Sequence, residues 1–147
     1  PSPLAFDGVC REPRSARLLQ ASCERTTRWL KRCKDEMARL KHEGISVNPD
    51  QLLFGINQGC TFADLRVEHM KQIADLDLDG YAIGGLAVGE PTEVMYEMIS
   101  AVEPYMPKDK IRYLMGVGTP GNIIEAVSRG VDLFDCVMPS RNARHGH

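Results

Sequence analysis

The sequence predicts an α/β protein in which parallel strands alternate with helices along the chain. After about residue 50, short apolar runs end in polar or glycine-rich turns, and each turn opens an amphipathic segment. This repeated order is typical of a βα array with a parallel sheet. The expected strands span 52–56, 81–83, 111–115 and 131–137, and the expected helices span 61–76, 90–104 and 119–128. A further strand is expected to end just before Asp7, which makes about five.

A long helix is expected ahead of this array, over about residues 13–43. Seven residues recur there with alternating spacings of four and three, which places them on one stripe of a helix. They are Leu19, Cys23, Thr26, Leu30, Cys33, Met37 and Leu40. Cysteine and threonine in the stripe favour packing on a sheet over a coiled coil. Gly44 and Pro49 are expected to end the helix.

The composition is that of a globular domain, with 43% hydrophobic residues and a formal net charge of −2 over 147 residues. No signal peptide or apolar run of membrane-spanning length is found, so a cytoplasmic location without a membrane partner is expected. The five cysteines form no Cys-x-x-Cys pair, which disfavours a zinc site or a disulfide framework. The last seven positions gather basic side chains that either bind phosphate or form a solvated surface: Arg141, Arg144, His145 and His147.

One glycine-rich turn admits two interpretations. The segment Gly116-Val-Gly-Thr-Pro-Gly121 fits G-x-G-x-x-G, follows a predicted strand and opens a helix, as in dinucleotide-binding proteins. However, the turn belongs to a late βα unit, and Pro120 removes an N–H group from the place where a phosphate would bind. A turn that offers backbone N–H groups to some other phosphate is the alternative.

Polar and glycine residues stand where the predicted strands end. In βα barrels the chemistry takes place at these ends and in the loops that follow them. The residues at these positions are Asp7, Gln58, Gly85, Gly116–Gly118 and Asp135. They are therefore the candidates for a functional site.

Five strings of sequence carry a family resemblance. They are Leu-Ala-Phe-Asp at 4–7, Phe-Gly-Ile-Asn-Gln-Gly at 54–59, Gly-Tyr-Ala-Ile-Gly-Gly-Leu-Ala-Val-Gly-Glu at 80–90, Tyr-Leu-Met-Gly-Val-Gly-Thr-Pro at 113–120 and Val-Asp-Leu-Phe-Asp-Cys-Val-Met-Pro-Ser-Arg-Asn-Ala-Arg at 131–144. Through these strings the chain resembles the tRNA-guanine transglycosylases, also called queuine tRNA-ribosyltransferases, over nearly its whole length.

The resemblance implies that residues 1–147 form the C-terminal half of a TIM-like (β/α)8 barrel, as one domain truncated at both ends. Family members replace guanine at the anticodon wobble position of tRNA with a 7-deazaguanine, either 7-aminomethyl-7-deazaguanine or queuine, in queuosine biosynthesis. The family's second essential aspartate lies upstream of the matching region, and its structural zinc site lies downstream. The resemblance therefore implies that this chain alone lacks a metal and is inactive.

By the same resemblance, Asp135 is the nucleophile that attacks the anomeric carbon of the ribose. A carboxylate stabilises an oxocarbenium-like transition state and forms a covalent glycosyl adduct, which a second base displaces. Asp7, Gln58 and Gly85 match the positions that bind the base. A carboxylate, a carboxamide and a backbone amide supply the acceptors and the donor that a purine-like edge requires.

Two further segments match the RNA-contacting loops of the family. The first offers backbone amides to phosphate and comprises Gly116, Val117, Gly118, Thr119, Pro120, Gly121 and Asn122. The second offers two planar guanidinium groups and comprises Ser140, Arg141, Asn142, Ala143 and Arg144. The implied partners are a tRNA anticodon loop, a free 7-deazaguanine base and, for the full-length enzyme, a second copy in a homodimer.

Two other functions stay open at this point. One is a non-catalytic RNA-binding subunit built on the same barrel, and the other is a fragment of a nicotinamide-dinucleotide-dependent oxidoreductase. The presence of Asp135 within its string speaks against the first, and the late position of the glycine-rich turn speaks against the second.

Overall fold

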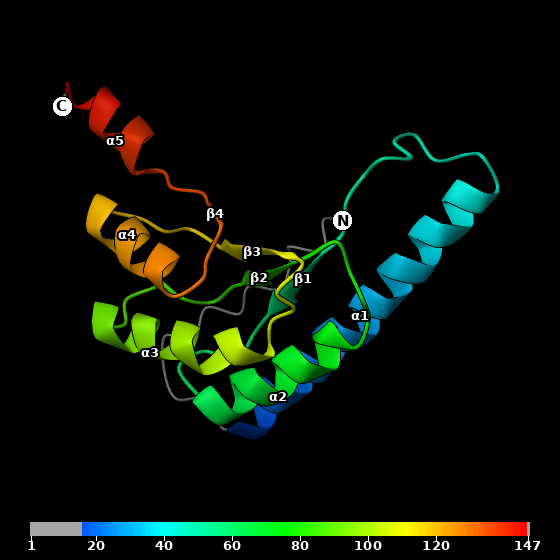
Figure 1. The fold of residues 1–147 in the computed structure, drawn as a ribbon, viewed down its shortest axis with the longest axis horizontal. Coiled ribbons are helices and arrows are strands. Elements are labelled where there is room, and N and C mark those ends of the chain that lie inside the picture. Colours follow the sequence, from blue (N-terminus) through cyan, green and yellow to red (C-terminus); the bar gives the residue numbers. More distant parts are fainter. Residues whose placement is uncertain (1–15, 147) are drawn as a thin grey trace.

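A four-stranded parallel sheet forms the centre of the chain in the computed structural model, which describes residues 16–146 (Figure 1). The strands are β1 (Phe54–Asn57), β2 (Gly80–Ile83), β3 (Ile111–Leu114) and β4 (Leu133–Phe134), and they pair in that same order. A parallel sheet whose spatial order follows the chain order is the arrangement of a βα barrel. The predicted α/β class with parallel strands is confirmed.

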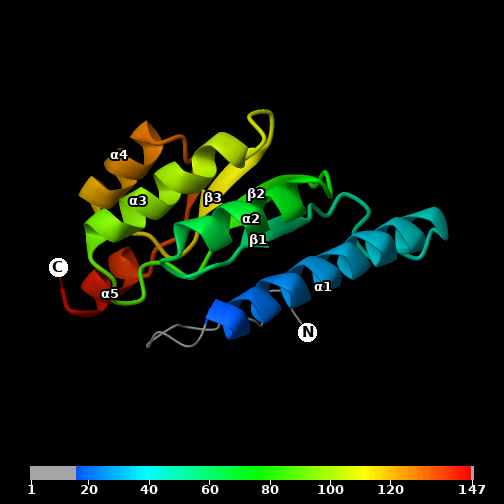
Figure 2. The ribbon, with the colours of Figure 1, turned by 90° about the horizontal axis from the view of Figure 1, so that it is seen from below.

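Each pair of neighbouring strands is joined by a helix, as the sequence predicts. The connecting helices are α2 (Ala63–Ala74), α3 (Thr92–Val102), which continues into the 3-10 turn η1 (Glu103–Tyr105), and α4 (Pro120–Ser128). Neighbouring helices pack against each other, and Figure 2 shows the three as one layer. The core between this layer and the sheet is fully buried and includes Met70, Ile73, Ile83, Ile99 and Leu114.

The long first helix, α1 (Ala16–His42), bears out the predicted stripe. Cys23 and Leu30 are buried, and the other stripe residues are half-buried. The helix lies against α2 and β1 rather than on the sheet face alone, and its C-terminal end extends past the sheet (Figure 2). The Thr27 hydroxyl is 3.3 Å from Oε1 of Gln72 on α2. No helix within residues 16–146 has the length and apolar character needed to cross a membrane.

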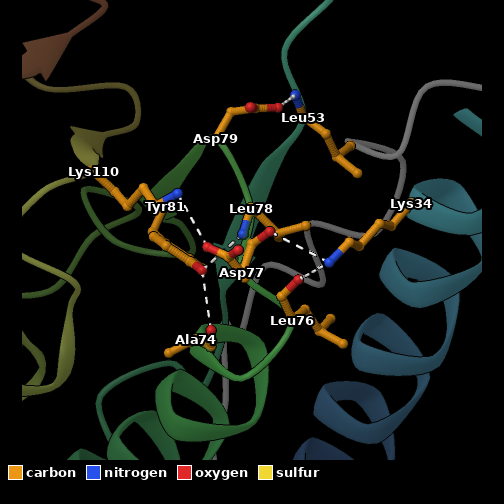
Figure 3. Close-up of polar contacts among 9 residues, drawn as sticks. All are labelled: Lys34, Leu53, Ala74, Leu76, Asp77, Leu78, Asp79, Tyr81 and Lys110. Atoms are coloured by element: carbon orange, nitrogen blue, oxygen red, sulfur yellow. Dashed lines mark hydrogen bonds and ion pairs between the residues drawn. The ribbon is translucent and has the colours of Figure 1, made fainter. Parts of the chain in front are cut away.

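Side chains tie together the amino ends of β1 and β2 (Figure 3). The Leu53 N–H donates to Asp79 at 2.8 Å, directly before the two strands begin. The Tyr81 hydroxyl donates to the carbonyl of Ala74 at 3.2 Å and accepts from the N–H of Leu78 at 3.0 Å. These bonds join the end of α2 to the start of β2, so they fix where each strand enters the sheet.

Two predicted boundaries were wrong. The last strand, expected over 131–137, covers only β4, because β3 turns away at Gly116 (φ +74°) and leaves the residues after Phe134 without a pairing partner. The segment after it, expected as a loop, forms the helix α5 (Met138–Arg144) with Pro139 in its first turn. The strand expected before Asp7 lies outside the described residues.

Candidate active site

The four strands end in register, which brings the predicted strand-end residues into one row. Asn57, Ile83, Leu114 and Phe134 are successive partners across the sheet. The residues that follow them are Gln58, Gly84, Met115 and Asp135. We call these four residues the strand-end row. Neighbouring strands are about 4.8 Å apart, so the row brings four distant parts of the sequence together at one end of the sheet.

The strand-end row faces away from the helix layer. The Asn57 side chain bonds to α2, and side chains alternate along a strand, so Gln58 points to the other face. A Cβ atom at Gly84 would lie 2.7 Å from Cγ2 of Ile56 and 3.5 Å from Sδ of Met115. These residues therefore share one face of the sheet, which is the inner face in a closed barrel.

Asp135 is exposed, and two hydrogen bonds hold its carboxylate in place. Its Oδ1 atom accepts from the Tyr113 hydroxyl at 2.6 Å and from the Gly116 N–H at 2.7 Å. Both donors belong to β3 or to the turn that follows it. Both bonds hold the carboxylate through the same oxygen. Neither of them occupies Oδ2, which is the atom suited to attack an electrophilic carbon.

Tyr113 is a candidate site residue that the sequence did not indicate. It aligns with Leu133, two residues before Asp135, so both side chains lie on the inner face. Partial burial and the hydrogen bond to Asp135 raise the pKa of Tyr113 to about 12. The phenol is therefore a neutral donor at physiological pH. Side chains alternate between the two faces of a strand, so this alternation could have indicated Tyr113. Its use requires the register of β3 on β4, which the sequence alone does not provide.

Gln58 is half-buried and follows β1 directly, as predicted. Its backbone N–H donates to Nδ1 of His69 on α2 at 2.9 Å. Burial, together with the nearby positive charge of Arg66, lowers the pKa of His69 to about 4. The ring is therefore neutral at physiological pH, and with Nδ1 as an acceptor its proton lies on Nε2. This bond anchors the backbone that carries the Gln58 carboxamide.

Gly85 lies one residue past the strand-end row, in the turn after β2. Its φ of +66° is in the left-handed region, where a side chain is strained, so the turn requires glycine here. The preceding Gly84 donates its N–H to the Asn57 carbonyl at 3.0 Å. The turns after β1 and β2 are thus joined directly. Gln58 and Gly85 each follow a strand end, as the sequence predicts, and the structure places them on adjacent turns.

The glycine-rich turn after β3 connects the row to α4. Gly116 has a φ of +74°, and the Thr119 hydroxyl caps α4 by accepting from the Asn122 N–H at 3.3 Å. Residues 116–122 thus form the loop and first helical turn that the sequence predicts. Dinucleotides bind where the strand order of a sheet reverses, and the order β1-β2-β3-β4 has no reversal. The oxidoreductase alternative is not favoured.

The basic segment 140–144 lies on α5, which extends away from the sheet (Figure 1). All five of its residues are exposed. Arg141 and Arg144 stand in the last turn of this helix, and Nδ1 of His145 lies 2.8 Å from the Arg141 carbonyl. The guanidinium groups are therefore exposed to solvent. Like Asp135, they follow β4 in the sequence.

Two further predictions concern Asp7 and a bound metal ion. Asp7, expected to bind the base, lies outside the described residues. Within residues 16–146, no three His, Cys, Asp or Glu side chains are grouped so as to hold a metal ion. The structural zinc of the family stays an expectation for the region downstream of the match.

Comparisons with known proteins agree on one family. The family model described as queuine tRNA-ribosyltransferase matches residues 4–147. The chain is 59% identical over 144 residues to a queuine tRNA-ribosyltransferase of Lachnospira eligens, and 60% identical over 144 residues to that of Clostridium acetobutylicum. Each match covers 98% of this chain and 38% of the relative. The chain therefore belongs to the queuine tRNA-ribosyltransferase family and spans 38% of the length of these relatives.

Proposed function

We propose that this chain forms part of an enzyme that exchanges a base in tRNA, with Asp135 as the nucleophile. The observation that carries the proposal is the exposed Asp135 carboxylate, which is held through Oδ1 in one row with Gln58 at the strand ends. Gly85 follows this row by one residue, in the turn after β2. The names of the relatives support transfer of a ribosyl group of tRNA. The base that leaves is guanine at the anticodon wobble position, and the base that enters is a 7-deazaguanine.

The reaction is a double displacement at the anomeric carbon of the ribose. Oδ2 of Asp135 forms a bond to this carbon while the bond to N9 of guanine breaks, and the electron pair goes to N9. A general acid outside the described residues protonates the leaving base. The incoming base then loses its N9 proton to the same group, which the first step left deprotonated. Its N9 attacks the same carbon, and the carboxylate leaves as the original anion. The two displacements together retain the configuration of the ribose.

Gln58 and the peptide at Gly85 bind the exchanged base. A carboxamide offers both a donor and an acceptor, and a peptide N–H adds a donor for the carbonyl of the base. Asp7 supplies the acceptor for the remaining N–H groups. Each of these groups recognises features that guanine and 7-deazaguanine share, so the same site accepts both bases in turn.

The glycine-rich turn at 116–122 and the exposed arginines of α5 bind the anticodon loop. An anticodon loop presents unpaired bases and closely spaced phosphates, which suit backbone N–H groups and the planar forks of Arg141 and Arg144. The target base needs no duplex to be opened before it reaches Asp135.

The active enzyme is longer than this chain, since the relatives extend well beyond the matched 38% of their length. In the complete enzyme we expect a closed barrel, a zinc-binding subdomain, a homodimer and a cytoplasmic location. The free 7-deazaguanine base is the second substrate. The isolated chain is expected to be inactive, because the upstream half of the barrel supplies the general acid.

A chimera tests the proposal, with this chain in place of the matching segment of the Lachnospira eligens protein. The chimera should incorporate labelled guanine into tRNA and form a covalent enzyme–RNA adduct that survives a denaturing gel. Tight tRNA binding with neither adduct nor incorporation would instead indicate the non-catalytic RNA-binding subunit. Absence of both tRNA binding and exchange in a folded chimera would overturn the proposal.

A further inference from the structure

A buried arginine lies behind the base-binding turns. Arg66 is on the first part of α2 and is fully buried, with 0% of its surface exposed. Burial of a guanidinium group is costly unless hydrogen-bond acceptors surround its N–H donors. Sequence reasoning gave no hint of it, because an arginine on an amphipathic helix is ordinarily solvent-exposed.

The Arg66 guanidinium joins two turns that are distant in sequence. At the end of β1 it donates to Oδ1 of Asn57 at 3.1 Å, and in the turn that follows it donates to the carbonyl of Cys60. In the turn after β2, it donates to the carbonyl of Gly84 at 2.8 Å and to that of Gly85 at 3.4 Å. The first turn contains Gln58 between its two contacted residues, and the second contains Gly85 itself.

Other contacts make this link rigid. Nδ2 of Asn57 donates back to the Arg66 carbonyl at 2.9 Å, so these two residues bond in both directions. Gly59 has a φ of +137°, and a Cβ atom there would lie 2.7 Å from Cγ of Arg66. The turn that carries Gln58 therefore packs directly onto the arginine stem, with no space for a side chain between them.

We propose that Arg66 is a positioning residue for base recognition, which sets the separation between the Gln58 carboxamide and the peptide at Gly85. This inference rests on the proposed function, because it concerns the two groups assigned there to the base. Arginine suits the task, since one planar group directs several donors at fixed angles to both turns. A lysine ammonium at the same position reaches one turn or the other and leaves carbonyls unpaired.

A second buried arginine provides the matched control. Arg112 on β3 is 7% exposed and makes a similar set of bonds, but at the amino end of the sheet. It pairs with Glu103 at 2.8 Å and donates to the carbonyls of Met106 at 2.9 Å and Gly130 at 3.5 Å. None of these residues belongs to the strand-end row or to the turns that bind the base. A purely structural role for Arg66 predicts that the two arginines respond alike to substitution.

The experiment compares Arg66→Lys with Arg112→Lys in the chimera described above. Steady-state incorporation of labelled guanine gives kcat and the KM values for guanine and for tRNA, thermal unfolding gives Tm, and calorimetry gives the Kd for free guanine. For Arg66→Lys we expect the guanine KM and Kd to rise roughly tenfold, because small displacements of positioned groups have effects of this size or larger. The KM for tRNA should stay within about twofold, since other segments bind most of the RNA. Arg112→Lys should lower Tm without changing the guanine constants.

A rise in the guanine KM and Kd no larger for Arg66→Lys than for Arg112→Lys would overturn the inference while leaving the proposed function intact. If Arg66→Lys does not fold, Asn57→Ser removes one partner and should raise the guanine constants about threefold, in line with loss of a single hydrogen bond. Unchanged constants in Asn57→Ser would then overturn the inference. An unsubstituted chimera that neither binds guanine nor exchanges it overturns the proposed function, and the inference with it.

Discussion

The two ends of the parallel sheet are built from similar residues and are organised in opposite ways. At the amino end, polar side chains bond to other groups of the fold, as Asp79 does to the Leu53 N–H at 2.8 Å and Lys110 does to Asp77 at 3.1 Å (Figure 3). At the carboxyl end, Asp135 is exposed and its two bonds both use Oδ1. One end uses its polar groups to fix the strands, and the other keeps part of a charged group available.

The buried arginines repeat this difference. Arg112 holds the segments that lead into the strands, whereas Arg66 holds the turns that lead out of them. Burial alone therefore does not separate a structural arginine from a functional one. What separates them is the set of backbone groups that each one fixes, and whether a candidate substrate contact lies among those groups. Substitutions matched between the two ends test this distinction.

The largest effect is expected from Asp135, and Asp132 at the other end of β4 provides its control. Asp135→Asn should lower base exchange in the chimera by roughly three orders of magnitude or more, because a neutral amide is a poor nucleophile. Asp132→Asn makes the same chemical change at the other end of the strand, where the carboxylate accepts from the Arg112 N–H at 3.0 Å. It should retain exchange. Equal loss of the covalent adduct in both variants would contradict the proposed difference between the amino and carboxyl ends of the sheet.

Tyr113→Phe should have the next largest effect. The substitution deletes the 2.6 Å hydrogen bond to Asp135 and leaves the bond from the Gly116 N–H. We expect kcat to fall about tenfold with little change in Tm, since a charged partner loses one of two positioning bonds. Tyr81→Phe is the matched control at the amino end, where the hydroxyl bonds to Ala74 and Leu78. It should lower Tm and leave kcat unchanged, and the reverse pattern would contradict the comparison.

Acid should weaken the carboxyl end through His69. Burial lowers the pKa of His69 to about 4 from a usual value of 6.5, so the unfolded chain takes up this proton at a higher pH. The stability from the neutral ring is present above pH 6.5 and is lost as the pH falls to about 4. The loss should reach about 3 kcal/mol.

Urea unfolding of the chimera at several pH values measures this loss. His69→Gln carries no titrating ring, so its stability should fall less steeply between pH 6.5 and pH 4. Identical slopes for the two proteins would show that His69 does not cause the acid sensitivity of this end.

The smallest effects are expected on α5. Arg141→Ala and Arg144→Ala should each weaken tRNA binding several-fold and reduce the salt dependence by about one released counterion. Lys108→Ala, an exposed cation in the loop between η1 and β3, is the control at the amino end and should leave both quantities unchanged. Filter binding across a salt series measures them. Unchanged affinity for tRNA in all three variants would show that the α5 arginines are only a solvated surface.

Sequence reasoning predicted most of the elements and named most of the candidate site residues, because each rests on local pattern. The spacing of the α1 stripe and the polar turn after each apolar run depend on neighbours in the chain, so they predicted α1, β1, β2 and β3 within a few residues. Asp135, Gln58 and Gly85 were named as candidates from their positions at the strand ends and from the family strings.

The features that were missed depend on contacts between distant residues. The partnership of Tyr113 with Asp135 follows from the register of β3 on β4, which no local pattern encodes. The burial of Arg66 follows from how α2 lies over the turns after β1 and β2. The length of β4 was overestimated for the same reason, since its end is set by the turn at Gly116 on another strand.

The aligned strand ends also constrain which insertions and deletions the gene can tolerate. Side chains alternate between faces, so one extra residue between Phe54 and Gln58 would turn the carboxamide towards α2 and bring Asn57 to the inner face. A residue added among 43–52, between α1 and β1, changes only an exposed loop and leaves every strand end where it is. Insertions and deletions should therefore be common in the loops before the strands and rare at the carboxyl ends of the strands.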